Sequence, residues 1–430
     1  MIPKRLRFAS VLIPACLLSF AFQVIGQQAA LKADFNGNGT VDFDDFFLFA
    51  DAFGARQGEA RFGAKFDLSG NGTVDFDDFF LFAADFGKKP GQTGGGGTKE
   101  VTVYIADLLQ DRVHILNTRD NLSAGTIQIV QPRGLAFSAG GSALYIASVD
   151  TFHAAQPDGR RDFSVPLNGA YKVAVSPDGQ KAYVTKEGDP ETPGTGGLAV
   201  LDLRAKKQSN FIPLPGRPSG IVLTPDGGKA YVANQTRRLI ILDLAREAVK
   251  DSLLVTNAIP TRVAISPDGG RVYLNSANSD TINVVDTAIN GGPEGRDRVV
   301  RTFATKTAES HLFSAILDLA LSSDSSRVYA SSYRLILATT PGSSEPTPTL
   351  VGELLILDVG TGKVDRILMG ENAVTLGVAP DGKTAYVVFQ RTVSEGLEVA
   401  VVDLETKKVV GSLPIAFDLP VDIKFRTVVR

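Results

Sequence analysis

The sequence predicts a mainly β chain, in which a seven-bladed β-propeller follows a small α-helical module at the N-terminus. Six copies of a strand–turn–strand pattern recur between residues 134 and 389, as expected for a repeat architecture built of blades. Two nearly identical 21-residue segments begin at Asp34 and Asp67. A run of glycines at 94–97 separates the two patterns, and we therefore place a domain boundary there.

The composition is that of a globular protein and excludes several functional classes. Apolar residues make up 43% and charged residues 21% of the 430 residues, which argues against wholesale disorder. A net charge of −3 provides no basic field, so we expect no nucleic-acid partner. Three His and one Cys are too few for a zinc site built from those ligands. Residues 34–86 hold 11 acidic side chains, three basic ones and 13 of the 25 Phe, which marks a separate acidic module.

Residues 1–30 have the pattern of a secretory signal peptide. Basic residues precede an apolar run at 8–25, and small residues follow, with cleavage expected near Gly26 or Ala30. The alternative is a retained membrane anchor, but this run is at the lower limit for spanning a bilayer and Pro14 interrupts it. We expect a secreted or cell-envelope protein with no membrane span after cleavage, and without disulfides, because the single Cys lies within the signal peptide.

Each of the two duplicated segments begins with a twelve-residue loop that fits a calcium site. Oxygen atoms fall at the ligand positions of both copies, with the backbone carbonyl at the Thr, which predicts two Ca²⁺ ions. Gly39 and Gly72 occupy the sixth position, where the loop turns sharply, and Val41 and Val74 follow in positions to join the loops as a short strand pair. The twelfth ligand is Asp instead of the usual Glu, which is one methylene longer. The predicted ligands are Asp34, Asn36, Asn38, Thr40, Asp42 and Asp45 in the first loop, and Asp67, Ser69, Asn71, Thr73, Asp75 and Asp78 in the second. The alternative is a pair of Asn-Gly turns with solvated acids.

A short helix is expected after each loop. Apolar residues recur at approximately helical spacing, acids stand at the start, where a helix N-terminus favours them, and Gly54 and Gly87 end the two helices. The apolar stripe is either the core of the small module or an exposed docking surface. It consists of Phe46, Leu48, Phe49 and Phe53 in the first copy and of Phe79, Leu81, Phe82 and Phe86 in the second.

This duplicated loop-and-helix unit, over residues 33–87, resembles the dockerin family of calcium-dependent modules. The resemblance implies calcium at the ligands named above, and docking to a cohesin-type or envelope protein through the helices. Loop positions ten and eleven carry Phe43-Asp44 and Phe76-Asp77, where dockerins of the best-known type carry small hydroxyl or aliphatic residues.

Beyond residue 101, period-two apolar strands alternate with turns. Each turn begins with Ser or an equivalent residue at positions 138, 176, 224, 266, 322 and 379, at intervals of 38 to 57 residues, which are typical of four-stranded blades. A first strand at 421–425 is left over at the C-terminus, and strands at 101–107 and 112–118 provide its missing partners. Joining the two ends completes a seventh blade without free sheet edges, although six or eight blades stay open. The domains are therefore 1–30 (signal peptide), 31–88 (calcium module), 89–100 (linker) and 101–430 (propeller).

The repeated word SPDGxxAYV, followed by a strand that ends in Leu-Asp-Leu, resembles the YVTN-type β-propellers, which include seven-bladed lactonase-like and surface-layer-associated members. The resemblance implies the fold and no single function, because propellers serve in binding, scaffolding and catalysis. We assign Pro-Asp-Gly to turns and the Tyr and Val positions to packing between blades.

The sequence contains no phosphate-binding Gly loop, no GxSxG and no HExxH motif. His114, His153 and His311 are isolated, and we assign them structural positions. Inserts at 187–197 and 341–349 are either contact loops or solvated linkers.

The leading interpretation is a secreted, calcium-binding, non-enzymatic binding or scaffold protein, whose propeller recognises a protein, a glycan or a surface component. The alternative is a secreted lactonase-like or polysaccharide-acting enzyme, and a third interpretation makes the calcium loops a purely structural spacer. Two or more carboxylates with perturbed pKa in the axial channel favour the enzyme, whereas small or neutral residues there favour binding.

Overall fold

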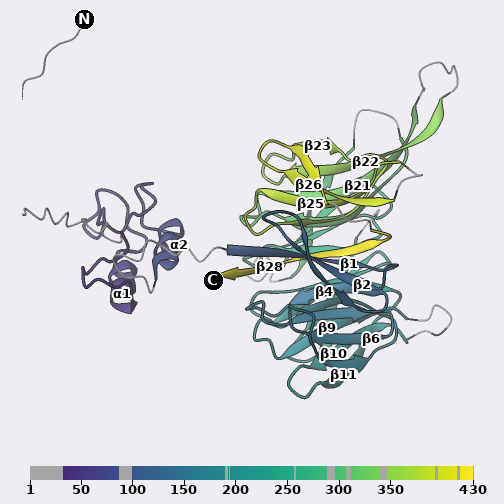
Figure 1. Cartoon of the computed structure of the whole chain (residues 1–430), viewed down its shortest axis with the longest axis horizontal. Helices are drawn as coiled ribbons and strands as arrows, with labels where there is room; N and C mark the ends of the chain where they lie inside the picture. Colours follow the sequence, from purple (N-terminus) through teal and green to yellow (C-terminus); the bar gives the residue numbers. More distant parts are fainter. Residues whose placement is uncertain are drawn as a thin grey trace, which may run out of the picture. The chain divides into compact units, whose positions relative to one another are not determined.

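The computed structural model describes residues 32–86, 99–188, 192, 194–255, 258–287, 296–306, 311–338, 346–392, 396–413 and 417–429. The chain divides into two compact units, 1–97 and 98–430 (Figure 1). The predicted signal peptide and residues 89–98 of the predicted linker lie outside the described residues. In the described part of the chain, no helix is both long and apolar enough to cross a membrane.

The first unit contains two ten-residue helices, α1 (Phe43–Ala52) and α2 (Phe76–Asp85). Asp42 caps α1, because its side chain accepts a hydrogen bond from the Asp44 backbone N–H while the Asp45 side chain accepts one from the Asp42 backbone N–H. Helix α1 ends just before Gly54, which adopts a φ of +83° that favours glycine. Gly87, the predicted end of the second helix, lies outside the described residues.

The apolar stripe of this unit is divided between a core and an exposed surface. Phe49 and Phe82 are buried and stack on each other with ring centroids 5.7 Å apart. Leu48, Leu81 and Phe86 are 37%, 45% and 42% exposed, so the stripe is neither all core nor all exposed surface. Because a helix with apolar residues around most of its circumference cannot bury all of them in so small a unit, part of the stripe stays on the surface.

The expected strand pair between Val41 and Val74 is also wrong. The Val74 backbone N–H donates to the Ala55 carbonyl and its carbonyl accepts from the Gly54 N–H, so the second loop pairs with the segment that follows α1. Both valines are nonetheless fully buried in the core of the unit.

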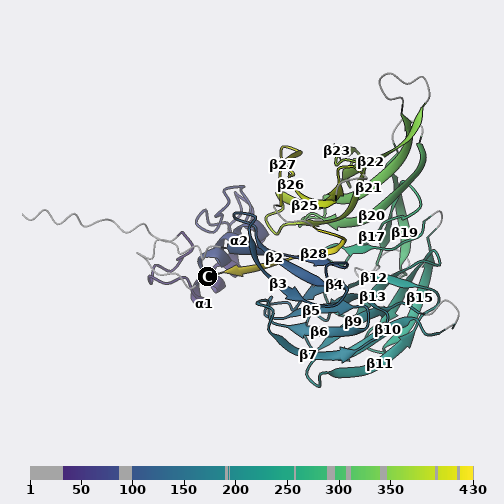
Figure 2. The ribbon, with the colours of Figure 1, turned by 45° about the vertical axis from the view of Figure 1, so that its right-hand side comes forward.

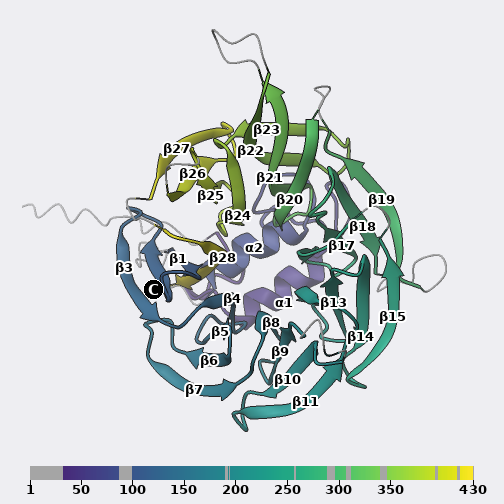
Figure 3. The ribbon, with the colours of Figure 1, turned by 90° about the vertical axis from the view of Figure 1, so that its right-hand side faces the viewer.

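The second unit consists, within its described residues, of seven four-stranded antiparallel sheets arranged as the blades of a propeller (Figures 1 and 3). Blade 1 contains β4 (Pro132–Phe137), β5 (Leu144–Ser148), β6 (Thr151–Ala155) and β7 (Arg161–Pro166). Blade 2 contains β8 (Ala170–Val175), β9 (Lys181–Lys186), β10 (Gly197–Asp202) and β11 (Lys207–Pro213). Blade 3 contains β12 (Pro218–Leu223), β13 (Lys229–Asn234), β14 (Arg238–Asp243) and β15 (Ala248–Leu254).

Blade 4 contains β16 (Val263–Ile265), β17 (Arg271–Leu274), β18 (Thr281–Asp286) and β19 (Arg298–Ala304). Blade 5 contains β20 (His311–Leu321), β21 (Arg327–Ala338), β22 (Thr347–Asp358) and β23 (Val364–Leu368). Blade 6 contains β24 (Asn372–Val378), β25 (Thr384–Gln390), β26 (Leu397–Asp403) and β27 (Lys408–Ser412). Blade 7 contains β28 (Pro420–Val429), β1 (Lys99–Asp107), β2 (Arg112–Asn117) and β3 (Ser123–Gln128), in that order across the sheet. The three long strands of blade 5 extend beyond the outline of the other blades (Figure 2).

Blade 7 confirms the predicted closure of the ring by the two ends of the propeller sequence. Strand β28 pairs with β1 from Lys99↔Val429 to Asp107↔Pro420. The fully buried Asp107 carboxylate accepts hydrogen bonds from the backbone N–H groups of Asp418 and Leu419, at 2.9 and 3.0 Å. The C-terminal strand is therefore the innermost strand of a blade whose other strands come from the start of the propeller.

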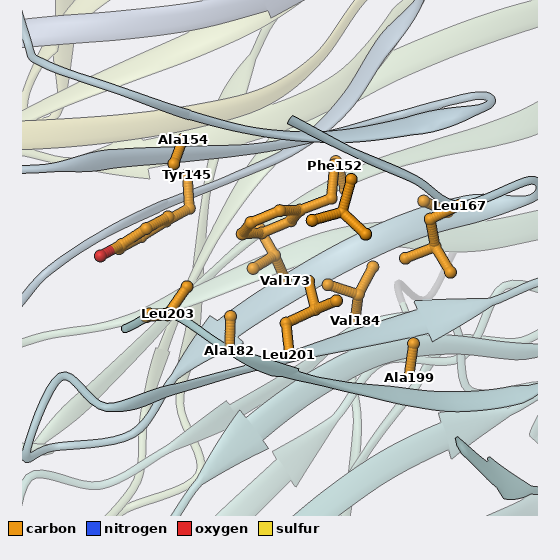
Figure 4. Close-up of a cluster of buried hydrophobic side chains, with 13 residues drawn as sticks. Tyr145, Phe152, Ala154, Leu167, Val173, Ala182, Val184, Ala199, Leu201 and Leu203 are labelled. Atoms are coloured by element: carbon orange, nitrogen blue, oxygen red, sulfur yellow. The ribbon is translucent and has the colours of Figure 1, made fainter. Parts of the chain in front are cut away.

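Apolar side chains between neighbouring blades form the core of the propeller. The second strand of every blade contributes a buried Tyr, and between blades 1 and 2 Tyr145 stacks on Phe152 beside Val173 and Leu201 (Figure 4). Side chains also form hydrogen bonds between neighbouring blades. For example, the buried Asn275 amide of blade 4 donates to the Ile316 carbonyl of blade 5 at 2.7 Å. The predicted assignment of the Tyr residues to packing between blades is confirmed.

Candidate functional site

Seven equivalent residues, one on or at the start of each innermost strand, form what we call the axial ring. The first six lie four residues before the residue that begins the turn of their blade, and the seventh has the same register on β28, two residues before Lys424, the partner of the buried Tyr104. In blade order its members are Gly134, Lys172, Gly220, Arg262, Asp318, Thr375 and Asp422. Because the innermost strands contact one another in the cyclic order β4, β8, β12, β16, β20, β24 and β28, neighbours in this list are neighbours around the axis (Figure 3).

The axial ring is electrically divided. Its two cations, Lys172 and Arg262, lie on blades 2 and 4 and flank Gly220. Its two carboxylates, Asp318 and Asp422, lie on blades 5 and 7 and flank Thr375. One arc of the ring is therefore cationic and the facing arc is anionic, with no net charge overall.

Lys172 and Asp422 form a buried ion pair across Gly134, with 3.0 Å between Nζ and Oδ2. The Lys172 ammonium also donates to the carbonyls of Arg133 and Val421, at 2.8 and 3.1 Å, which uses all three of its N–H groups. Burial alone raises the pKa of Asp422, but the charges of Lys172 and Lys424, with the Leu135 backbone N–H, lower it to about 2. Asp422 is therefore a fixed anion at neutral pH.

Arg262 and Asp318 form a looser pair. The distance between Arg262 Nε and Asp318 Oδ1 is 3.7 Å, and this buried Nε has no hydrogen-bond partner among the described residues. Arg262 Nη1 donates to the Tyr171 hydroxyl at 3.1 Å. Asp318 accepts hydrogen bonds from the Leu319 backbone N–H at 2.9 Å and from the Thr375 hydroxyl.

The charges of the ring act on one another. Burial alone lowers the pKa of the Arg262 guanidinium, but Tyr171, Asp318 and Asp422 together raise it above its usual value. Burial raises the pKa of Tyr171, and the positive charges of Arg262 and Lys172 outweigh burial and lower it. Titratable groups that shift one another's pKa and lie together in a cavity are typical of functional sites.

The ring opens into an axial cavity with a volume of about 240 Å³. Its lining includes four charged members of the ring, together with Lys424 and apolar side chains such as Val173, Ile221, Leu319 and Leu376. Ligand pockets for drug-sized molecules span about 300–1,000 Å³, so this cavity fits a small ligand. An apolar wall with a few charged groups is the usual composition of such a site.

The predicted calcium ligands lie in two loops of matching geometry. In the first loop, the Asp34 carboxylate accepts from the N–H groups of Gly37 and Gly39 at 2.8 and 2.9 Å, and Asp45 accepts from those of Asn36 and Asp42 at 2.9 and 3.0 Å. In the second loop the equivalent hydrogen bonds run to Asp67 from Gly70 and Gly72 and to Asp78 from Ser69 and Asp75, at 2.7–2.9 Å.

The chemistry of these loops fits a hard cation, because every predicted ligand is an oxygen atom and the twelfth-position carboxylates Asp45 and Asp78 are fully buried. Among the described residues, no three Asp, Glu, His or Cys side chains lie close enough together to hold a metal ion. The calcium prediction therefore stays a prediction.

The structure gives His114 and His153 structural surroundings. His114 is buried with Nε2 4.0 Å from Asp107 Oδ2, and Nδ1 of the buried His153 lies 2.9 Å from the Ser164 hydroxyl. Burial lowers the pKa of both. Parts of the two inserts, at 189–191 and 341–345, lie outside the described residues.

Sequence reasoning missed the axial ring, although the signal was present. The aligned turns fix the position of each innermost strand, and counting back four residues from each turn gives Gly, Lys, Gly, Arg, Asp and Thr. Charged residues that recur at one position of otherwise largely apolar innermost strands are unusual enough to mark a site.

Comparisons with known proteins support the propeller. No protein-family model matches the chain. Antigen Lp49 of Leptospira interrogans is 27% identical over 138 residues, and the match spans only 30% of this chain and 30% of that relative's own length.

Three solved structures show the same fold. The periplasmic gluconolactonase PpgL of Pseudomonas aeruginosa is 16% identical with a TM-score of 0.59, covering 77% of this chain and 99% of that chain. A Bacteroides uniformis protein provisionally assigned as a 6-phosphogluconolactonase is 15% identical with a TM-score of 0.57, covering 76% and 99%. Hydrazine synthase of Kuenenia stuttgartiensis is 22% identical with a TM-score of 0.51, covering 64% and 77%. At these identities the likeness shows a β-propeller and leaves the chemistry of the axial cavity to be argued from its residues.

Proposed function

We propose that this protein is an exported hydrolase of small lactones, with the active site in the axial cavity. The observation that supports this most is the axial ring, which places two carboxylates and two cations around a cavity of small-molecule size. The charged lining, which includes Asp422 with its lowered pKa, favours the enzyme over the scaffold interpretation, for which small or neutral residues were expected. The likeness to gluconolactonase structures agrees with this choice of reaction.

The proposed reaction assigns a separate task to each side of the ring. Asp318 accepts a proton from a water molecule, whose oxygen adds to the lactone carbonyl carbon. Arg262 and Lys172 stabilise the negative charge that develops on the carbonyl oxygen. The ring C–O bond then breaks, the leaving alkoxide takes the proton back from Asp318, and a hydroxy acid is released. Asp422, whose pKa is about 2, is a poor base, so we assign it to holding Lys172 in place.

The test is hydrolysis of glucono-1,5-lactone and γ-butyrolactone by the full chain without its signal peptide, followed by acid release. We expect turnover, and a loss of about 10²–10⁴-fold in kcat for Asp318→Asn, the range for removal of a general base. Asp162→Asn is the matched control, because Asp162 forms an exposed ion pair with Lys206 on the outside of the propeller. The absence of turnover with every lactone would overturn the enzyme proposal.

We propose that the N-terminal module binds two Ca²⁺ ions through the twelve predicted ligands. The observation in its favour is the pair of fully buried carboxylates, Asp45 and Asp78, at the same position of two matching loops. Phe43 and Phe76 are 66% and 65% exposed at equivalent positions, and we propose that they contact an envelope or cohesin-like protein.

Calorimetric titration of the full chain with Ca²⁺ tests the metal proposal. We expect two sites in the parent protein and one in Asp45→Asn or Asp78→Asn, because each change removes a charged ligand from one loop. Asp51→Asn on α1 is the control, since Asp51 is exposed and outside both loops. A parent protein that takes up no Ca²⁺ would leave the loops as structural turns.

A further inference from the structure

The division of the axial ring into a cationic and an anionic arc is more specific than lactone hydrolysis requires. A neutral sugar lactone has no group that matches either arc. Buried charges are costly unless they are paired, and Arg262 and Asp318 are only loosely paired, at 3.7 Å, so a ligand gains most when it presents an opposite charge to each of them.

From this arrangement we propose that the axial cavity binds zwitterionic small molecules of the α-amino acid type, and that its substrate is an amino-substituted lactone. The ligand ammonium lies against Asp318 and Asp422, and the carboxylate produced by ring opening lies against Arg262 and Lys172. The inference rests on the proposed function, because it names the substrate class of the same cavity.

The contacts on the anionic arc leave room for an ammonium group. The Asp318 carboxylate accepts hydrogen bonds from one backbone N–H and from the Thr375 hydroxyl. Each of its oxygens has a further lone pair for another donor. Asp422 uses Oδ2 for Lys172 and the Leu135 N–H, while Oδ1 has Lys424 at 3.5 Å. The Lys424 side chain is 47% exposed, so it can turn towards solvent when another cation arrives.

On the cationic arc, the two cations differ in how fully protein groups already occupy their N–H donors. Lys172 has donated all of its N–H groups to protein acceptors and therefore acts through its charge. The Arg262 pair with Asp318 is longer, at 3.7 Å, and the guanidinium lines the cavity. Gly220, between them, adds no side chain to this arc. An anionic group can therefore approach both cations from the cavity.

The cavity volume also matches this class. A cavity of about 240 Å³ corresponds to about eight water molecules at ~30 Å³ each. A small amino acid fits this space.

The test compares three ligands of similar shape by calorimetry on the full chain. L-homoserine carries both charges, 4-hydroxybutanoate carries only the carboxylate, and 3-amino-1-propanol carries only the ammonium. We expect L-homoserine to bind at least about tenfold more tightly than either single-charge analogue, equivalent to about 1.4 kcal/mol. Homoserine lactone should likewise exceed γ-butyrolactone in kcat/KM by at least about tenfold.

Two variants test which side chain contacts the ammonium and which contacts the carboxylate of the ligand. Asp318→Asn should reduce the preference for L-homoserine over 4-hydroxybutanoate while leaving the weaker binding of 4-hydroxybutanoate in place. Arg262→Gln should reduce the preference for L-homoserine over 3-amino-1-propanol. Asp162→Asn on the exposed surface should change neither ratio. Tyrosine fluorescence establishes that each variant is folded, because all nine Tyr lie between residues 104 and 386 and the chain has no Trp.

The outcomes separate this inference from the function on which it rests. If γ-butyrolactone and homoserine lactone are hydrolysed equally, or 4-hydroxybutanoate binds as tightly as L-homoserine, the zwitterion inference is overturned and the lactonase proposal stands. If L-homoserine binds with the expected preference but no lactone is opened, the hydrolase proposal fails and the cavity is a binding site for zwitterions. Absence of L-homoserine binding overturns the inference.

Discussion

Asp422 illustrates how one side chain connects the fold to the site. It belongs to the C-terminal strand, it completes the axial ring, and its ion pair with Lys172 joins blade 7 to blade 2 at 3.0 Å. Removing one partner of a buried pair leaves the other charge unpaired, which is far more costly than replacing both.

We therefore expect Asp422→Asn to lower the free energy of unfolding of the propeller by about 3–5 kcal/mol. Tyrosine fluorescence during urea unfolding measures this effect for the propeller alone. The double variant Asp422→Asn with Lys172→Met should recover part of the loss, since no charge stays unpaired. Asp162→Asn, at an exposed pair, should change little. A single variant no less stable than the double would contradict the argument.

The same ion pair predicts a pH dependence. The pKa of Asp422 is about 2 in the folded protein and about 3.9 in an unfolded chain, so the unfolded state binds the proton first as the pH falls. The stabilisation is complete above about pH 4, is lost towards pH 2, and amounts to about 2–3 kcal/mol. We expect the stability difference between the parent and Asp422→Asn to shrink between pH 6 and pH 3. A difference that is constant with pH would exclude Asp422 as its source.

Individual residues were predictable from the sequence where local chemistry determines them. The Pro-Asp-Gly turns depend on neighbouring residues, as at Ser176, whose hydroxyl donates to Asp178 at 2.6 Å and accepts from the Lys181 N–H at 2.9 Å. Lys172 and Asp422 are 250 positions apart in the sequence, and nothing local indicates that they meet. Predicting the axial ring requires knowing how the seven blades close around the axis, whereas each turn can be predicted from a few neighbouring residues.

At the scale of elements, the innermost strands are held close together by glycines. A Cβ atom on Gly134 of β4 would lie 2.6 Å from the Tyr171 carbonyl oxygen and 3.2 Å from Lys172 Cδ. This close approach lets the Lys172 side chain cross blade 1 to reach Asp422.

We expect Gly134→Ala to push β4 away from β8 and to destabilise the propeller by about 1–3 kcal/mol, the usual cost of overpacking. It should also weaken ligand binding in the axial cavity, because Lys172 is displaced. Gly140→Ala is the matched control, since its Cβ would meet nothing within 4 Å. Thermal unfolding followed by tyrosine fluorescence compares the two, and equal stability of both variants would contradict the packing argument.

The elements themselves were largely predictable, because the propeller strands alternate with period two and their turns carry explicit signals. The helices were harder to orient. A segment of ten residues rich in apolar side chains predicts each of the helices α1 and α2, but it does not determine which Phe is buried. In α1, Phe43 and Phe47 are over 60% exposed, while Phe49 is buried. The missing information is the packing partner, which lies about 33 residues away in the other copy.

At the scale of the whole molecule, the propeller is a ring closed by one pair of strands from opposite ends of the domain. The sequence predicted this closure because a first strand was left over at one end and its partners at the other. The pairing encloses more than 300 residues between Val101 and Thr427, so opening this seam exposes two strand edges and releases the entropy that was lost in closing so long a loop.

A disulfide across the seam should stabilise the propeller through the unfolded state. Val101 and Thr427 are direct partners in the β1–β28 register, and no other Cys remains once residues 1–30 are removed. For Val101→Cys with Thr427→Cys we expect a gain of about 3–5 kcal/mol in unfolding free energy when oxidised, since long loops gain most, and none when reduced. Urea unfolding with and without reductant measures the difference. Val101→Cys with Arg426→Cys is the control, because a shift of one residue places the second Cβ on the opposite face of the sheet. Equal stability of the oxidised and reduced forms of the matched pair would contradict the argument, because a crosslink that closes so long a loop without strain must restrict the unfolded chain.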